Sequence, residues 1–342
     1  MASQRIKKLK RNLKNPVLIR NSQDLFYLTG HYLVDGGFLF ISKNQVVLFG
    51  CFLEKIPGLK TDYLRNIGKY LGKQKELHID DHLKLAELNF LKKVLKKKKL
   101  TPISSPVKDL RSVKDSEELK KMKKAYVVTA KVFSEIKSVL RKKQWREKDL
   151  ARFIRLAGIK YGADDISFPT IVASGKNAAI PHHVPTDKII KAGESIILDF
   201  GFKVDGYCSD FTRTVFLKTV PPKLREMYET TETAYKLAVA ATKAGKTGKE
   251  IDKIARDLLA LKKFDKYFIH SLGHGTGLAV HESPSLHEKS EDILENGMVF
   301  SIEPGVYIPK IGGVRIEDLV YLDKGKVKYF RKATTNLKDM II

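Results

Sequence analysis

The chain has 342 residues, of which 43% are hydrophobic and 9% aromatic, a composition typical of soluble globular proteins that excludes disorder along its whole length. At ~150 residues per domain, this length exceeds one ordinary hydrophobic core and predicts two domains. The 64 Lys and Arg residues outnumber the 39 Asp and Glu residues and give a net charge of +25.

Neither a membrane span nor a secretory signal is expected. No apolar run approaches the ~18 residues that cross a bilayer, and the basic opening MASQRIKKLKRNLKNP lacks the apolar stretch of a signal peptide. The two cysteines, Cys51 and Cys208, are too few for a disulfide framework. We therefore expect a cytoplasmic protein without a membrane partner.

The positive charge is concentrated in the first third of the chain. Residues 1–112 hold 23 Lys and Arg against 9 Asp and Glu, whereas the remaining residues hold 41 against 30. Such a surface could attract nucleic acid or another polyanion. We favour the alternative of solvated helix faces, because the apolar residues of LKKVLKKKKL (91–100) recur as on an amphipathic helix covered with lysine. A nucleic-acid partner is therefore not expected.

Strand and helix patterns alternate along the first part of the chain. Strand-like runs occur in PVLIRNSQDLFYLTG, GGFLFISKNQVVLFG and ELHIDD, whereas LKTDYLRNIGKYLGK and LKLAELNFLKKVL have helical spacing. The stretch TPISSPVKDLRSVKDSEE (101–118) then combines prolines and serines with a helix start at Asp115 or Ser116. We expect a small α/β domain over residues 1–112 and a second domain over 113–342.

The second domain begins with long helical patterns, 116–141 and 147–161, and returns to strands in FPTIVASG and ILDFGFKVDGYCSDFTRT (197–214). Two further helical stretches, 221–245 and 248–261, precede a glycine-rich C-terminal third. The sequence shows no convincing internal repeat.

The stretch ILDFGFKVDGYCSDFTRT predicts a hairpin that carries two acids. A turn at Asp205-Gly206 pairs Val204 with Tyr207 and Asp199 with Thr212. Asp199 and Asp210 then lie on one face, about 7 to 8 Å apart at Cα. Two like charges repel unless a cation lies between them, and a pair of divalent ions would serve. The alternative is a solvent-facing hairpin with ordinary surface acids.

Two other segments of this domain carry chemistry-bearing residues. IHSLGHGTGLAVHESP (269–284) contains His270, His274 and His281, and its glycines would let an ion or a substrate backbone come close. In SIEPGVYIPKIGGVRIED (301–318), a loop centred near Lys310 places Glu303 opposite Glu317, although a slip of one residue would separate them. Four carboxylates and one imidazole suit two divalent ions ~3.5 to 4 Å apart, which lower the pKa of a bridging water to make hydroxide.

Five motifs, in this order, resemble the pita-bread metallopeptidases, which include methionine aminopeptidase, Xaa-Pro aminopeptidase and prolidase: IPHHVP, LDFGFKVDGYCSDFTRT, GHGTGLAVHE, SIEPGVYIP and GGVRIED. The resemblance runs from about residue 110 to the end and, more loosely, through DLFYLTG. It implies an α/β (α+β) fold class: a pita-bread catalytic domain, with an antiparallel sheet flanked by helices, after a smaller α/β domain of the creatinase/prolidase type.

The resemblance also implies roles for individual residues. The metal ligands would be Asp199, Asp210, His274, Glu303 and Glu317, of which Asp210 and Glu317 bridge the two ions. Glu303 would be the general base, and His182 and His281 would stabilise the tetrahedral intermediate and shuttle protons.

Three further side chains surround this set in the resemblance. His270 matches a histidine that lines the proline subsite, and Arg315 matches an arginine that would orient and neutralise the adjacent glutamates. His183, beside His182, is expected to be an ordinary surface side chain. Cys208 is interpreted as a packing residue.

The N-terminal domain and the close spacing of Glu303 and Glu317 resemble the proline-directed enzymes rather than methionine aminopeptidase. Prolidases usually place an arginine four residues after the histidine that matches His281, to hold the free carboxylate of a dipeptide; this position is Ser285. Its absence favours longer peptides, unless Lys289 or another lysine substitutes. KKQWREKDLARF lacks the usual glycine, and FGCFLEK departs from the usual acidic motif of the N-terminal domain.

The resemblance therefore implies a homodimeric Xaa-Pro aminopeptidase that acts on proline-containing peptides with two divalent ions. Manganese is favoured by the oxygen-rich ligands, with cobalt, zinc or iron as alternatives. Xaa-Pro dipeptidase (prolidase) activity is the second possibility. Two rivals from other classes are a non-catalytic pita-bread scaffold that binds nucleic acid or protein, and creatinase-like C–N hydrolysis without metal.

Overall fold

The computed structural model describes residues 2–33, 36–50 and 56–342. Its chain forms two compact units, Met1–Arg111 and Ser112–Ile342. Cys51 and most of the FGCFLEK motif lie outside the described residues.

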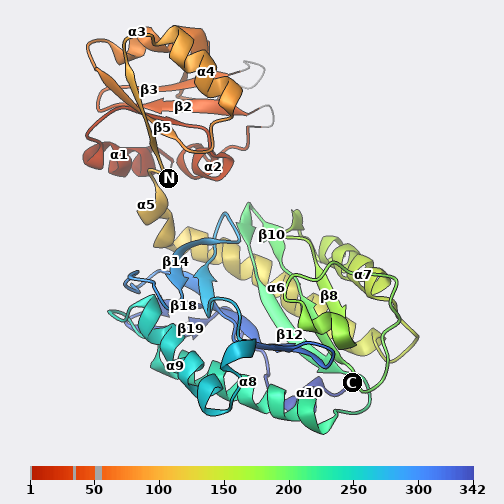
Figure 1. Ribbon diagram of the computed structural model, residues 1–342. Helices are drawn as coiled ribbons and strands as arrows, with labels where there is room; N and C mark the ends of the chain where they lie inside the picture. The colour runs from red at the N-terminus through yellow and green to blue at the C-terminus, as the bar shows by residue number, and fades with distance from the viewer. Residues whose placement is uncertain (1, 34–35, 51–55) are drawn as a thin grey trace. The chain divides into compact units, whose positions relative to one another are not determined.

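The N-terminal unit is a mixed six-stranded sheet with the order β4-β3-β2-β1-β5-β6. Within this unit, α1 and α2 lie on one face of the sheet and α3 and α4 on the other (Figure 1). Its elements, with a connecting α5 at its end, are α1 (Ala2–Asn12), β1 (Val17–Ile19), α2 (Ser22–Thr29), β2 (Gly37–Ile41), β3 (Val46–Gly50), β4 (Lys60–Asp62), α3 (Ile67–Leu71), β5 (Glu76–Asp80), α4 (Leu85–Val94), β6 (Lys99–Ile103) and α5 (Lys108–Ser112).

Two strand and helix predictions for this unit are wrong in detail. DLFYLTG forms most of helix α2 rather than a strand, because the Asn21 side chain caps the helix at the Asp24 amide and Gly30, at φ 77°, ends it. The helix expected to cover residues 91–100 ends at Val94, and Leu100 lies instead in β6, opposite Leu77 of β5. Pairing with a buried strand outweighs the helical spacing of these lysines and leucines.

The C-terminal unit is built around a large antiparallel sheet with the order β14-β13-β15-β18-β12-β9-β8, to which β19 adds beside β18. Smaller sheets are formed by β7, β10 and β11, and by β16 and β17. Its strands are β7 (Asp165–Ile166), β8 (Ile171–Ser174), β9 (Ser195–Asp199), β10 (Phe202–Val204), β11 (Tyr207–Cys208), β12 (Phe211–Phe216), β13 (Gly273–Gly275), β14 (Glu282–Leu286), β15 (Val299–Ile302), β16 (Gly305–Ile308), β17 (Gly312–Arg315), β18 (Glu317–Asp323) and β19 (Lys326–Tyr329).

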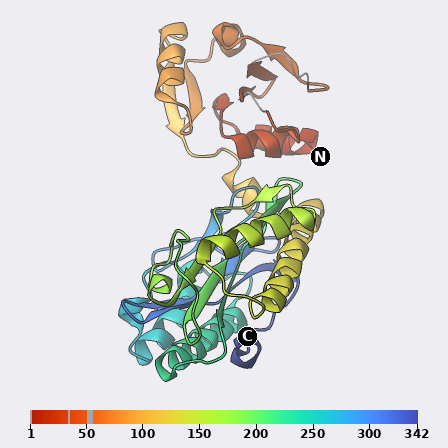
Figure 2. The same ribbon diagram turned by 90° about the vertical axis from the view of Figure 1, so that its right-hand side faces the viewer.

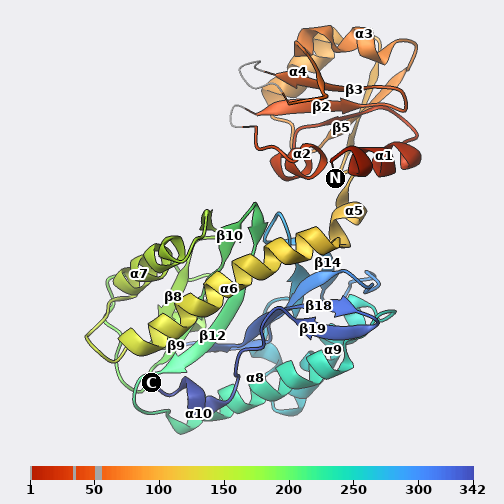
Figure 3. The same cartoon turned by 180° about the vertical axis from the view of Figure 1, so that it is seen from behind.

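The helices of this unit pack along these strands. They are α6 (Ser116–Val139), α7 (Glu147–Lys160), α8 (Pro222–Ala241), α9 (Gly248–Leu261) and α10 (Leu337–Met340). Helices α6 and α7 contact each other, as Figure 2 shows, and reach β10 and β8 respectively. Helices α8 and α9 form a second pair that contacts β17 and β14 (Figure 3). The two helix pairs predicted from the sequence are therefore present.

The start of α6 illustrates how the sequence sets a helix boundary. The Asp115 side chain accepts hydrogen bonds from the amides of Glu117 and Glu118, and the Glu118 carboxylate accepts one from the Asp115 amide. This reciprocal arrangement satisfies donors that the first helical turn leaves free. Over the described part of the chain, no helix combines the length and the apolar character needed to cross a membrane.

Candidate metal centre

The acidic hairpin has the register that the sequence predicts. Val204 pairs with Tyr207, and Asp199 pairs with Thr212. Asp205 and Gly206 form the turn with φ angles of 51° and 83°, the left-handed conformations that a two-residue hairpin turn requires.

Burial excludes the alternative of ordinary surface acids. Asp199 and Asp210 are only 8% and 4% exposed. The other face of the hairpin carries Phe200, Phe202 and Phe211, whose rings pack edge to face with centroids 5.9 Å apart for Phe200 with each of the other two. Cys208 is also fully buried, in agreement with a packing role.

The second acidic pair also has the predicted register. Ile302 pairs with Asp318, and Gly305 pairs with Arg315, so Glu303 and Glu317 stand opposite each other between these pairs. Lys310 lies at the centre of the connecting loop with a φ of 67°. Strand β18 also pairs with β12, with Glu317 opposite Thr212, which brings the second acidic pair to the first.

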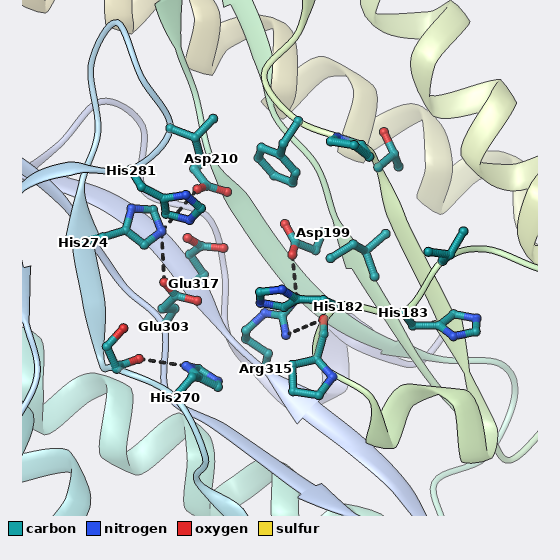
Figure 4. A pocket seen from close by; sticks show the side chains of 18 of the residues that line it. His182, His183, Asp199, Asp210, His270, His274, His281, Glu303, Arg315 and Glu317 are labelled. Atoms are coloured by element: carbon teal, nitrogen blue, oxygen red, sulfur yellow. Dashed lines mark hydrogen bonds and ion pairs between the residues drawn. The ribbon is translucent and has the colours of Figure 1, made fainter. Parts of the chain in front are cut away.

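His274 on β13 completes the cluster. Its Nε2 lies 3.2 Å from Glu303 Oε1 and 3.7 Å from Asp210 Oδ2. A glycine is required before it, because a Cβ on Gly273 would lie 2.0 Å from the Ser301 carbonyl oxygen. The ring of His281 packs against that of His274 at a centroid distance of 4.3 Å. Figure 4 shows His274, Asp210, Glu303 and Glu317 turned toward one another.

The electrostatics of the cluster fit bound cations. Burial and the neighbouring carboxylates both raise the pKa of Asp210 and that of Glu317 well above their ordinary values. Asp199 Oδ1 and Glu317 Oε1 are buried and find no hydrogen-bond partner in the part of the chain that the structure describes. Ligand atoms of Asp210, His274 and Glu317 all lie within 4.8 Å of one another, close enough to share an ion. Divalent cations would supply the charge and the partners that these oxygens lack.

The charge of Arg315 acts on the adjacent glutamates as expected, since it lowers the pKa of Glu303 and opposes the rise in that of Glu317, but its direct hydrogen bond is to another acid. Its Nη2 donates to Asp199 Oδ2 at 2.5 Å, rather than to the adjacent glutamates, and its Nη1 donates to the Tyr307 hydroxyl at 2.6 Å. Hydrogen bonds link Arg315 to Glu317 through Thr212, whose hydroxyl donates to Glu317 Oε2 at 2.6 Å and accepts from Arg315 Nε at 3.3 Å. The hairpin geometry explains this, because Thr212 stands between Asp199 and Glu317 in the sheet.

His270, His182 and His281 line the same cavity as the ligands. His270 Nε2 lies 2.9 Å from the Tyr307 hydroxyl, and its Nδ1 lies 2.7 Å from the Ser271 carbonyl oxygen. Burial lowers the pKa of His270 and that of His281, which favours neutral imidazoles near pH 7.

The cavity has a volume of about 550 Å³ and an apolar wall beside the carboxylates. This wall is formed by Phe168, Pro169, Ile171, Pro181, Val184, Pro185 and Val280. Of the described residues that line the cavity, Arg315 is the one lysine or arginine. Ser285 lies outside the lining on β14, opposite His274, with its amide bound to Asp292 at 2.8 Å. Such a cavity suits a small substrate with an apolar part.

The prediction of a surface position for His183 is wrong. Its side chain is 9% exposed, and its Nε2 lies 2.9 Å from Oε2 of the fully buried Glu147. His183 points away from the carboxylate cluster (Figure 4).

Sequence reasoning also missed Glu147 and Tyr307. The only sequence signal for Glu147 was an acid at the start of a helical pattern, which is common, and the burial that makes this carboxylate need donors from elsewhere is visible only in the structure.

The fold and the buried carboxylate–histidine cluster define a hydrolytic metalloenzyme of the pita-bread type. Residues 120–324 match metallopeptidase family M24, and the chain belongs to this family. The Xaa-Pro dipeptidase of Pyrococcus furiosus is 35% identical over 341 residues, with 97% of each chain covered.

Solved structures agree. The Xaa-Pro dipeptidase from Bacillus anthracis superposes with a TM-score of 0.94 at 31% identity, with 100% of both chains covered. The X-Pro aminopeptidase from Thermotoga maritima superposes with a TM-score of 0.86 at 28% identity, with 96% of this chain and 99% of that chain covered. The predicted family and fold class are therefore confirmed.

Proposed function

We propose that this metallopeptidase is an exopeptidase that hydrolyses the Xaa-Pro bond at the N-terminus of peptides with two divalent ions. The observation that carries the proposal is a cluster of three buried carboxylates, with Glu303 and His274 partly buried beside them, at the side of a cavity with an apolar wall. Similarity to an Xaa-Pro dipeptidase and to an X-Pro aminopeptidase over nearly the whole chain supports proline as the recognised residue.

The residues that would hold the ions are Asp199, Asp210, His274, Glu303 and Glu317. We propose manganese, since oxygen ligands predominate, with cobalt, zinc and iron as alternatives. When bound, the ions would supply an activated water and polarise the scissile carbonyl.

The remaining steps belong to the side chains. Glu303 would accept the proton of the attacking water and return it to the leaving proline nitrogen. His182 and His281 would donate hydrogen bonds to the oxyanion of the tetrahedral intermediate. His270, held by the Tyr307 hydroxyl, would bound the proline subsite beside the apolar wall.

Two substrate lengths have separate support. Ser285 stands where prolidases usually carry an arginine, and Arg315, the one lysine or arginine among the described lining residues, is engaged with Asp199. A dipeptide carboxylate would thus find no free arginine or lysine among these residues, which favours longer peptides. The second candidate, Xaa-Pro dipeptidase, is favoured by the names of the relatives from Pyrococcus furiosus and Bacillus anthracis.

Purified protein assayed with Xaa-Pro and Xaa-Pro-Xaa peptides tests both proposals. We expect the tripeptide to be cleaved with the higher kcat/KM in the presence of Mn²⁺. A higher value for the dipeptide would select the second candidate. No cleavage of either peptide with manganese, cobalt, zinc or iron would refute the proposed function.

We propose that residues 1–112 form a creatinase/prolidase-type domain, supported by full-length superposition on the Bacillus anthracis dipeptidase. A cytoplasmic location, a homodimer and the lack of a nucleic-acid partner stay predictions from the sequence and from the family resemblance.

A further inference from the structure

Glu147 is a buried acid that takes no part in the proposed metal centre. It is the first residue of α7, its side chain is fully buried, and it lies outside the lining of the cavity. Burying a carboxylate is costly unless it is fully hydrogen-bonded. Its partners should therefore show what this charge does for the fold.

Among the described residues, the hydrogen-bond partners of the Glu147 side chain all come from one segment, residues 174–186, which runs from the end of β8 through the loop that follows it. Its Oε1 accepts from the amide and the hydroxyl of Ser174 at 2.8 and 2.9 Å and from Asn177 Nδ2 at 3.1 Å. Its Oε2 lies 2.9 Å from His183 Nε2 and accepts from the amide and the hydroxyl of Thr186 at 3.1 and 2.7 Å. One side chain thus fixes both ends and two interior points of the loop.

This loop forms one side of the proposed active site. Pro181, Val184 and Pro185 belong to the apolar wall of the cavity, and His182 lines it directly before His183. The His182 side chain is exposed, so its position depends on the backbone that carries it. A shift of an ångström in that backbone would misplace a group that must meet the substrate carbonyl.

We infer that Glu147 is a positioning residue that clamps the 174–186 loop and, through His183, sets the place of His182 in the active site. This inference rests on the proposed function for the role of His182 but not for the order of the loop. The ionised form suits the clamp: burial raises the pKa of Glu147, but the donors from His183, Thr186 and Ser174 outweigh burial and leave that pKa below its ordinary value.

The substitution Glu147→Gln replaces one acceptor oxygen by a donor that would face several donors. The matched control is Glu118→Gln, because Glu118 is also a buried helical acid, bound to the Tyr207 hydroxyl at 2.9 Å and absent from the cavity lining. A general effect of losing a buried carboxylate appears in both variants, whereas loss of the clamp appears in Glu147→Gln alone.

The first measurement needs no activity. Hydrogen exchange of the metal-loaded full chain should show faster exchange at the amides of Ser174 and Thr186 in Glu147→Gln and unchanged exchange there in Glu118→Gln. If Glu147→Gln does not fold, Thr186→Val removes one of the bonds to Glu147 and should produce the same change at Ser174. Unchanged exchange in the loop would overturn the inference, whether or not the protein cleaves Xaa-Pro bonds.

The second measurement is a double-mutant cycle with His182→Ala on an Xaa-Pro peptide. Glu147→Gln should lower kcat about 10- to 100-fold while KM changes little, as for other residues that orient catalytic groups. In the His182→Ala background, Glu147→Gln should lower kcat little further, because His182, through which Glu147 acts, has been removed. A full additional loss in that background would assign Glu147 a structural role only. A wild type with intact loop protection but no peptidase activity would refute the proposed function and leave the clamp supported.

Discussion

Asp210 and Glu317 show at the residue scale why this site requires cations. Each is almost completely buried, at 4% and 2% exposure, and each lies among other carboxylates. Arg315 offsets part of this charge, but its guanidinium donates its hydrogen bonds to Asp199 and Thr212 rather than to Glu317. The charge balance of the centre is therefore incomplete without bound ions.

Replacement of Asp210 tests its proposed place between the two ions. We expect Asp210→Asn to lower kcat by about 10³-fold or more and to release metal, because a shared ligand serves both ions. Asp205→Asn, at the exposed turn of the same hairpin, should retain both activity and metal, since Asn also tolerates a positive φ. Metal content measured by mass spectrometry shows whether Asp210 is needed to hold the ions. Full metal content and full activity in Asp210→Asn would contradict the role.

The raised pKa values of Asp210 and Glu317 have a consequence for the metal-free protein. Because their pKa rises on folding from ordinary values of 3.8 and 4.5, the folded state binds more protons. The stability from these groups is thus complete below the ordinary values and is lost as pH rises through the folded-state pKa. We expect the Tm of the EDTA-treated protein to fall with rising pH more steeply in the wild type than in Asp210→Asn. An equal dependence of Tm on pH in the two proteins would argue against the raised pKa values of Asp210 and Glu317.

At the scale of elements, two hairpins and one glycine-lined strand bring distant ligands together. Strand β12 pairs with both β9 and β18, so Thr212 stands opposite Asp199 on one side and Glu317 on the other. Strand β13 contacts β15 through Gly275 and Phe300, which places His274 near Glu303. Asp199, His274 and Glu317 lie on strands, whereas Asp210 and Glu303 lie in short links between paired strands, so the sheet holds all five ligands in place.

Gly273 tests how closely β13 must approach its neighbour. A Cβ at this position would lie 2.0 Å from the Ser301 carbonyl oxygen, so Gly273→Ala should push His274 away and reduce metal affinity by about 10- to 100-fold. Gly68→Ala is a suitable control, because its new Cβ would meet only Leu95 Cδ2 at 3.8 Å. Metal titration by calorimetry compares the two. Wild-type affinity in Gly273→Ala would refute the packing constraint.

Sequence reasoning succeeded where local chemistry determines the structure. The Asp205-Gly206 turn and the loop around Lys310 each specify a register, and that register places all four acids. It failed where the deciding contact is distant in sequence. Leu100 joins β6 because Leu77 of β5 lies beside it. Helix α2 is an exception, because the residues that begin and end it, Asn21 and Gly30, adjoin it in the sequence. His183 is buried because Glu147, 36 residues earlier, accepts its hydrogen.

At the scale of the whole molecule, the net charge of +25 invites comparison with polyanion-binding proteins. In the C-terminal unit, however, several helix lysines are paired with acids one turn away, as for Lys236 with Glu232 and Lys253 with Asp257. Such exposed pairs are weak individually but cancel the local positive field. The charge is therefore compatible with a peptidase whose partner is a small peptide.

We expect no shift of a short RNA by the metal-loaded protein at about 150 mM salt in a gel assay, where nonspecific phosphate contacts are largely weakened. A metal-independent shift that persists at this salt and disappears at higher salt would revive the nucleic-acid scaffold as the function.

The most direct test of the central claim joins metal content to proline-specific cleavage in the full-length chain. Metal-stripped protein is titrated with Mn²⁺ while bound metal and hydrolysis of an Xaa-Pro-Xaa peptide, and of the same peptide with alanine in place of proline, are followed together. The five proposed ligands predict that hydrolysis of the proline peptide rises with metal content and saturates near two ions per chain, while the alanine peptide stays uncleaved. Cleavage of the proline peptide by metal-free protein, or no cleavage at saturating metal, would contradict the claim.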